Sequence, residues 1–364
     1  MTSFTTLLLA AACAVILSGV VRRLPGPSAV PLPDRWHRAV TPVTGGIAIF
    51  GAFVIALQPA IVSGAVDRRY WPVVLGAAGA FALGFWDDAR SIGVRYKFAG
   101  QVILALIAAS AGVRPDWLPL WAAVPAAFLV LVASMNSFNL LDNMDGLAAG
   151  TAAVAALGLA LVGGLVAGSG SPVVAAALAG ACLGFLPFNY RRGRPAALFM
   201  GDSGSHLLGF TVGGLALLAS PSGAGGAVAA VAAPLLILAL PVLDTLLVML
   251  VRLAEGRPVW QGGRDHSSHR LVYHGLSERR AVAVLLGIAA NCTTTAIALV
   301  ILDDLLLTAV AAGMTLAGLV AFASRLVIVT EAGIMLPLDV VSPVLTDELD
   351  AQLGVGEEPS VQVV

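Results

Sequence analysis

The sequence has little charge. Only 11% of its 364 residues are Asp, Glu, Lys or Arg, against roughly 25% in a soluble domain. Hydrophobic residues make up 59% of the chain, and the mean hydropathy is +0.93. A soluble fold cannot cover that much apolar surface, so the composition excludes a soluble protein and predicts an all-α polytopic membrane protein in a lipid bilayer. The net charge of −1 gives no indication of a nucleic-acid partner, and none is expected.

Cysteine is also scarce. Cys13, Cys182 and Cys292 lie far apart in apolar segments, which excludes a disulfide or zinc framework. The first apolar segment lacks a preceding basic region, and Arg22 and Arg23 follow it, so it is predicted to be a spanning helix and not a signal peptide. No segment of about 20 to 50 residues recurs. We expect one integral membrane domain over residues 1–330, followed by an acidic, flexible tail over 331–364.

Long apolar runs are abundant. Runs of about 16 to 25 residues can span a bilayer as helices, and the sequence predicts ten to eleven such spans. The eleven runs are 3–21, 43–65, 71–86, 98–113, 118–135, 146–168, 171–189, 204–220, 226–250, 281–302 and 305–326.

The basic residues lie on one side of this predicted topology. One set of alternate loops holds seventeen Lys and Arg residues, and the other set holds three, namely Arg68, Arg69 and Arg114. Basic loops stay in the cytoplasm. This distribution predicts a multi-pass protein of a bacterial-type inner membrane, with its N-terminus outside and an active site facing the cytoplasm.

A polar stretch, Asn136 to Gly150, lies between two apolar runs. Asn136, Asn139 and Asp142 are spaced three apart and share one face if the helix continues across them. With Asp145, the stretch carries two carboxylates and no Lys or Arg, which favours a bound cation or a ligand rich in hydrogen-bond donors. The alternative is a helix cap and a turn.

Asp87 and Asp88 are adjacent at the inner end of the third run. Such a pair favours a divalent cation, or holds one proton for acid–base work. The alternative is an interfacial pair stabilised by Arg90. Lys97 is the only lysine in the chain. Its compact charge suits a phosphate contact, although composition bias also explains it.

The segment from Phe199 to His206 places Asp202 between two glycines at a predicted helix start. A helix N-terminus attracts anions, and an aspartate beside it can hold Mg²⁺ for a diphosphate. The alternative is that Asp202 only caps the helix.

Residues 262–271 contain His266 and His269 between Arg264 and Arg270. Two histidines alone make a weak metal site, so a phosphate or pyrophosphate pocket is favoured over a metal site. The alternative is a basic interfacial loop. Asp244 lies inside the ninth run, where a carboxylate costs roughly 3 kcal/mol. It is either functional or held by a neighbouring helix.

These segments bring carboxylates, one lysine, two histidines and several arginines to one face. The combination predicts a Mg²⁺-dependent transfer of a phosphate group from a soluble nucleotide to a membrane-embedded acceptor.

Four motifs in order resemble the polyprenyl-phosphate N-acetylhexosamine-1-phosphate transferase family, which includes the phospho-MurNAc-pentapeptide translocases and the N-acetylglucosamine-1-phosphate transferases. The resemblance covers about His37 to Leu271. The matching residues are Pro42 with Gly45-Gly46; Asp87-Asp88 with Lys97 and Gln101; Asn136, Asn139, Asp142 and Asp145-Gly146; and Phe199-Met200-Gly201-Asp202-Ser203-Gly204-Ser205.

The chain departs from the family in three places. Asn143 and Met144 stand in the family's Asp-Gly-Leu-Asp-Gly in place of Gly and Leu. Ser268 replaces the middle residue of the late histidine cluster, and the early Arg-Lys-x-His is reduced to Arg35-Trp36-His37. The continuation His269-Arg270-Leu271 is more similar to the N-acetylglucosamine branch than to the muramyl-pentapeptide branch.

The resemblance implies that a polyprenyl phosphate, in bacteria undecaprenyl phosphate, attacks the β-phosphorus of a UDP-N-acetylhexosamine and that UMP leaves. UDP-GlcNAc is the expected donor, and UDP-MurNAc-pentapeptide and UDP-GalNAc are alternative donors. A membrane transporter or a non-catalytic scaffold is the alternative from a different functional class. A homodimer is left open.

The resemblance also assigns roles. Asp202 ligates Mg²⁺, for which Mn²⁺ is a substitute. Asp87 and Asp88 lie by the lipid phosphate, one as general base, and Phe199 stacks on uracil. Asn136, Asn139, Asp142 and Asp145 contact the nucleoside or sugar. The residues expected to meet phosphates are Lys97, Arg264, His266, His269 and Arg270, with His266 counted among the catalytic groups.

Overall fold

A computed structural model of the chain describes residues 2–31, 39–165, 171–219, 226–260, 262–301 and 304–326. The predicted Arg35-Trp36-His37 element and the acidic tail lie outside these residues. Within them, the regular secondary structure is α-helical, apart from the 3₁₀ helix η1 (Arg68–Tyr70) and a pair of antiparallel two-residue strands, β1 (Ser28–Ala29) and β2 (Thr41–Pro42). The α-helices are α1 (Ser3–Val21), α2 (Gly45–Val62), α3 (Trp71–Arg90), α4 (Val94–Ser110), α5 (Leu120–Leu141), α6 (Leu147–Leu165), α7 (Ser171–Asn189), α8 (Gly201–Leu218), α9 (Gly226–Ile237), α10 (Ala239–Ala254), α11 (Ser267–Tyr273), α12 (Glu278–Ile301) and α13 (Leu305–Leu326).

Seven helices in the described part of the chain are long and apolar enough to cross a membrane: α1, α2, α5, α6, α7, α12 and α13. Helices α9 and α10 pass the same test together but bend by 69° at Leu238, and count as an eighth span if the pair is one span. The all-α polytopic prediction is confirmed.

The number of described helices that could span a membrane by length and composition, seven or eight, is lower than the predicted ten to eleven. The three remaining runs form α3, α4 and α8, which are helical as expected. Each carries polar residues at one end, such as Asp87 on α3, Lys97 on α4 and Asp202 on α8. These residues lower the hydropathy of α3 and α8, and α4, with 17 residues, is shorter than the seven spanning helices, which have 18 residues or more.

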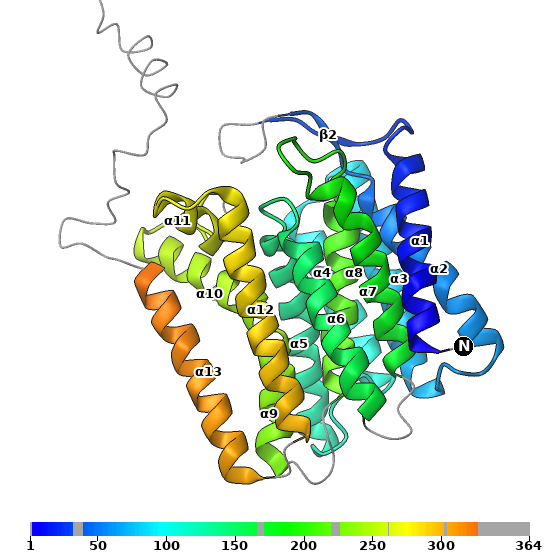
Figure 1. Cartoon of the computed structure of the whole chain (residues 1–364), viewed down its shortest axis with the longest axis vertical. Coiled ribbons are helices and arrows are strands. Elements are labelled where there is room, and N and C mark those ends of the chain that lie inside the picture. The colour runs from blue at the N-terminus through cyan, green and yellow to red at the C-terminus, as the bar shows by residue number, and fades with distance from the viewer. Residues whose placement is uncertain are drawn as a thin grey trace, which may run out of the picture.

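Helix α8 is the centre of the bundle. Its side chains from Ser203 to Leu218 are buried, and α2, α3, α5, α6, α7 and α9 pack around it. In Figure 1 the long helices run roughly side by side, α13 stands at the edge, and α10, α11 and β2 lie at one end. The N-terminus lies at the opposite end of the bundle (Figure 1). The polar segments singled out in the sequence therefore gather at one end.

Close backbone approach fixes this end of the bundle. The first N–H groups of α2 have no side-chain cap, and they donate instead to backbone carbonyls, Gly45 to Phe199 at 2.8 Å and Gly46 to Met200 at 2.9 Å. The Phe199 N–H in turn donates to the Pro42 carbonyl at 2.9 Å. The segment that leads into α8 is thereby held between β2 and α2, as orphan N–H groups at a helix start require partners.

Helix α3 approaches α8 at Gly84. A Cβ at this position would lie 2.2 Å from the carbonyl oxygen of Asp202. We expect Gly84→Ala to push α3 from α8 and to lower the free energy of unfolding by about 1–3 kcal/mol, because the contact is to backbone that cannot rotate away. Thermal unfolding of the purified protein measures this. Gly287→Ala is the matched control, since a Cβ there meets nothing within 4 Å. Equal melting temperatures for the two variants would contradict the close α3–α8 contact.

Candidate active site

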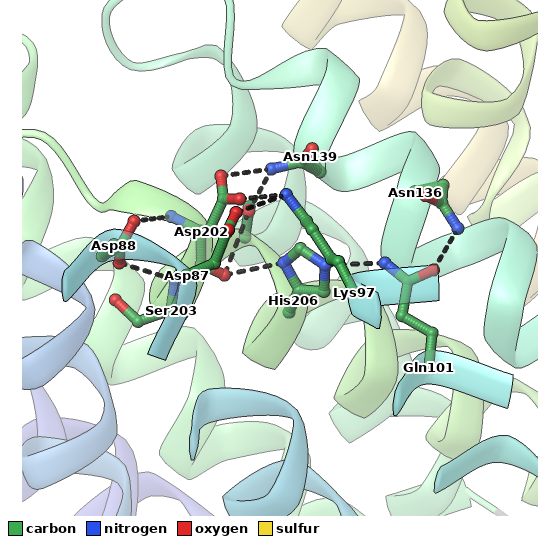
Figure 2. A network of polar contacts seen from close by, with 10 residues as sticks. Asp87, Asp88, Lys97, Gln101, Asn136, Asn139, Asp202, Ser203 and His206 are labelled. Carbon is green, nitrogen blue, oxygen red and sulfur yellow. Dashed lines mark hydrogen bonds and ion pairs between the residues drawn. The ribbon is translucent and has the colours of Figure 1, made fainter. Parts of the chain in front are cut away.

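Asp88 caps the N-terminus of α8. The helix begins at Gly201, which has a φ of +69°, and its N-cap residue Met200 makes no side-chain cap hydrogen bond. The Asp88 carboxylate on α3 accepts the N–H of Asp202 at 2.8 Å and the N–H of Ser203 at 2.9 Å (Figure 2). A carboxylate at this position satisfies two orphan donors and complements the helix dipole. Asp202 is therefore not the cap, and its side chain is available for other contacts.

Lys97 joins the carboxylates of two helices. Its Nζ donates to Asp87 Oδ2 at 3.0 Å and also to Asp202 Oδ2 (Figure 2). Asn139 on α5 donates from Nδ2 to Asp202 Oδ1 at 2.7 Å and to Ser205 Oγ at 3.0 Å. Both oxygens of Asp202 are thus held by donors from neighbouring helices. Since Asp88 lies beside them, the three aspartates outnumber the one lysine.

Asp142 and Asp145 lie near these aspartates. The helix continues past Asn136 and Asn139, so the condition for a shared face holds for them, and Asp142 is its C-cap. Burial, followed by the charges of Asp202, Asp145 and Asp88, raises the pKa of Asp142 to about 8. Burial also raises the pKa of Asp145 to about 6, against the hydrogen bond from the Ala196 backbone. At pH 7 the Asp142 carboxyl is neutral, and a nearby cation would favour its ionised form.

A buried chain of hydrogen bonds leads from Asn136 through Gln101 and His206 to Asp202 (Figure 2). The Asn136 Nδ2 lies 2.8 Å from the Val132 carbonyl, which fixes it as a donor, and 2.7 Å from Gln101 Oε1. The Gln101 Nε2 therefore donates to His206 Nε2 at 2.7 Å, and His206 Nδ1–H donates to the Asp202 carbonyl at 2.8 Å. This direction of donation makes His206 a neutral imidazole, and it satisfies Asn136 within the protein.

The sequence prediction did not include His206 or Gln101 among the site residues. Each lies four positions after a site residue, His206 after Asp202 and Gln101 after Lys97, inside an otherwise apolar run. That spacing places both on the same helix face as the charged residue, and it is the pattern that indicates them.

His266 is held by Asp244. The Asp244 side chain is fully buried, and it accepts His266 Nδ1–H at 2.8 Å, Ser267 N–H at 2.7 Å and Ser267 Oγ–H at 2.6 Å. Of the two alternatives for Asp244, the structure shows the hydrogen bonds to a neighbouring segment. These bonds fix the imidazole orientation and leave Nε2 as the ring nitrogen for a ligand.

His269 stacks edge-on against His266 with ring centroids 5.4 Å apart. Burial lowers the pKa of His269 to about 3, and the His266 and Arg264 charges act in the same direction. The ring of His269 is therefore neutral at pH 7, so it would offer a ligand a neutral hydrogen-bonding group and not a cation.

The Arg270 side chain donates hydrogen bonds to backbone carbonyls. Its Nε donates to the Asp265 carbonyl at 3.0 Å and its Nη1 to the Leu326 carbonyl at 2.8 Å. Asp265 itself accepts Arg252 Nε at 3.1 Å and Arg257 Nη2 at 2.8 Å. These contacts tie α11 to the end of α13 and brace the loop before it, whereas a phosphate contact was predicted for Arg270.

Asn189 aligns the loop that carries Asp145. Its Oδ1 accepts the Gly146 N–H at 2.7 Å, and its Nδ2 donates to the Leu198 carbonyl at 3.1 Å. Gly146 has a φ of +81° and packs against Tyr190, so no side chain fits there. This bridge, which the sequence prediction missed, sets the loop of residues 142–146 beside the segment that holds Phe199.

The carboxylate oxygens around Asp202 suit Mg²⁺ if substrate phosphates and water supply the remaining ligands of the metal ion. Within the described ranges, no group of three or more His, Cys, Asp or Glu side chains is arranged to hold a metal ion. Mg²⁺ commonly takes one or two protein carboxylates and completes its shell with substrate phosphates and water. Asp202 faces an excess of carboxylates, and oxygen ligands of this kind fit Mg²⁺ and not a soft metal.

The comparisons with known proteins agree with this geometry. Residues 70–220, which include α3 to α8, match the glycosyl transferase family 4 profile. The chain is 33% identical over 297 residues to the decaprenyl-phosphate N-acetylglucosaminephosphotransferase of Mycolicibacterium smegmatis, covering 71% of this chain and 72% of that one. The chain belongs to glycosyl transferase family 4.

Two further members of glycosyl transferase family 4 show how broad the similarity is. A probable undecaprenyl-phosphate N-acetylglucosaminyl 1-phosphate transferase of Bacillus subtilis is 30% identical over 289 residues, 74% of this chain and 77% of that one. A phospho-N-acetylmuramoyl-pentapeptide-transferase of Heliobacterium modesticaldum is 37% identical over 205 residues, 50% of this chain and 62% of that one. The family resemblance drawn from the four motifs is confirmed.

Proposed function

We propose that this chain transfers N-acetylglucosamine-1-phosphate from UDP-N-acetylglucosamine to a polyprenyl phosphate in the bilayer and releases UMP. The observation that carries the proposal is Lys97, whose ammonium lies between Asp87 and Asp202 at the head of the buried helix α8. One cation among several carboxylates, at one end of a bundle of membrane helices, suits chemistry between phosphates. The N-acetylglucosamine-phosphate transferases among the relatives support this choice of donor and acceptor.

In this reaction an oxygen of the polyprenyl phosphate forms a bond to the β-phosphorus, and the bond from that phosphorus to the bridging oxygen of UDP breaks. UMP leaves with the bridging oxygen. A phosphate monoester is already largely ionised near pH 7, so placement of charge matters more than removal of a proton. Asp87 is the carboxylate beside Lys97 that would take up a remaining proton.

The protein groups divide into three roles. Asp202, with Asp142 nearby, would hold Mg²⁺, which would neutralise the diphosphate of the donor. Lys97 would exchange a carboxylate contact for the transferred phosphate, and His266 would present Nε2 to the diphosphate. Phe199 and the loop 142–146 would hold the nucleoside and sugar, because Asn189 aligns the two segments.

The proposed orientation places the site in the cytoplasm and the N-terminus outside an inner membrane of bacterial type. Support comes from the seventeen-to-three distribution of basic residues. It comes also from Figure 1, in which the N-terminus and α11 lie at opposite ends of the bundle. A soluble UDP-sugar is made in the cytoplasm, so this orientation gives the site access to it.

The test is UMP release by the purified protein with polyprenyl phosphate and, in parallel, UDP-GlcNAc, UDP-GalNAc or UDP-MurNAc-pentapeptide. We expect UDP-GlcNAc to give the highest kcat/KM. Chelation with EDTA is expected to abolish turnover, and Mg²⁺ or Mn²⁺ to restore it. No UMP from any donor would refute the transferase proposal, and full activity in EDTA would refute the metal.

His206→Leu should weaken catalysis without unfolding the protein. The change removes the donor to the Asp202 carbonyl and the acceptor for Gln101, and each loss costs about 1–2 kcal/mol. We expect kcat/KM to fall about tenfold or more. Thr211→Val is the matched control, because it removes a buried hydroxyl of α8 that bonds only to the Leu207 carbonyl. Equal kinetics for the two variants would exclude a positioning role for His206.

A further inference from the structure

A hydrogen bond joins the loop 142–146 to α11. The Ser268 hydroxyl donates to Asn143 Oδ1 at 2.5 Å across a sequence separation of 125 residues. The direction is fixed, because Asn143 Nδ2 donates to the Leu140 carbonyl at 2.8 Å and so turns its oxygen toward Ser268. The Ser268 side chain is fully buried. A buried hydroxyl and a half-buried amide oxygen thus satisfy one another.

The Asn143–Ser268 bond lies between the loop 142–146 and α11, and each of these segments carries candidate site residues. Asn143 directly follows Asp142, whose pKa is raised by burial and then by the charges of Asp202, Asp145 and Asp88. Ser268 lies between His266 and His269 on the first turn of α11. Asp244 fixes the start of this helix from α10, and Arg270 fixes it to α13. The Asn143–Ser268 bond joins α11 directly to the loop 142–146, which carries Asp142 and Asp145.

We propose that Asn143 and Ser268 form a positioning pair that sets the distance between the loop 142–146 and α11. The pair holds His266 and His269 at the diphosphate of the donor, and in this respect the inference rests on the proposed function.

A double-mutant cycle tests the pair. Ser268→Ala and Asn143→Ala each leave a polar group without its partner, so each is expected to raise the KM for UDP-GlcNAc about tenfold. The double variant is expected to be no worse than the poorer single variant, whereas independent sites would give about a hundredfold. Thr315→Ala is the matched control, because its hydroxyl contacts Thr295 between α12 and α13, away from the site. Additive effects would overturn the proposal. So would a lower melting temperature with unchanged kcat and KM, since that is the mark of a purely structural bond.

The failure of this inference and of the proposed function can be told apart. If the unaltered protein releases UMP but the cycle is additive, the pair alone is rejected. If the unaltered protein releases no UMP, the transferase proposal is rejected, and hydrogen–deuterium exchange decides on the pair. Ser268→Ala is expected to raise exchange both in residues 142–146 and in 267–273, and unchanged exchange in either segment would overturn the pairing.

Discussion

Replacing Asp202 by asparagine is expected to lower the rate of UMP release by about 10³-fold, which is the size of effect seen when one preorganised electrostatic contact is lost. Both Asp202 oxygens accept from donors, Oδ1 from Asn139 and Oδ2 from Lys97. An amide must turn its own NH₂ toward one of these donors, so the substitution removes the charge and also sets a donor against a donor. Steady-state kcat and KM with UDP-GlcNAc measure the loss.

Asp116→Asn serves as the matched control for this experiment. It also removes a carboxylate from an ion pair, with Arg69, but its side chain is 56% exposed and it precedes α5 at the end far from Asn139. We expect its kcat to stay unchanged, because exposed pairs contribute about 0–1 kcal/mol. A folded Asp202→Asn protein with more than a tenth of the original rate would contradict the role of Asp202.

Asp88→Ala is expected to lower both stability and activity, the latter by about a hundredfold. The substitution leaves the N–H groups of Asp202 and Ser203 without an acceptor, and each unsatisfied buried group costs about 1–3 kcal/mol. The start of α8 would then shift, and Asp202 with it. Thermal unfolding and kcat/KM for UDP-GlcNAc, measured on the same preparation, test this coupling of stability to rate.

Asp88→Asn separates this capping role from that of a general base. An asparagine keeps one oxygen to accept an N–H, and Asn is as good an N-cap as Asp. We therefore expect Asp88→Asn to retain more activity and a higher melting temperature than Asp88→Ala. If Asp88→Asn is instead as inactive as Asp202→Asn while its melting temperature stays unchanged, Asp88 acts in proton transfer and not as the cap.

The sequence predicts the helices well, because the spans depend on local composition. Each of the eleven apolar runs is a helix or the bent pair α9–α10. The motifs also identify the end of the bundle at which the polar residues meet. The residues in direct contact there are Asp87, Asp88, Lys97, Asn139 and Asp202.

The different contacts of these residues do not follow from the sequence. Asp87 and Asp88 are neighbours in the chain, yet one bonds to Lys97 and the other caps α8, because successive residues of a helix point about 100° apart. Which of the two meets α8 depends on how α3 rotates and slides against a helix that follows more than a hundred residues later. The placement of Arg270 on two carbonyls and the contact of Ser268 with Asn143 depend in the same way on packing between distant segments.

The cap that Asp88 provides for α8 has a consequence for the order in which the protein is made. Asp88 precedes its partner Asp202 by 114 residues, so it emerges from the ribosome long before the helix that it caps. Asp87, by contrast, accepts a hydrogen bond from Lys97, which follows it by only ten residues within the α3–α4 hairpin. The hairpin can thus neutralise part of its own charge at the membrane surface during synthesis. The site itself is completed only when α8 has inserted, because contacts between distant segments form late.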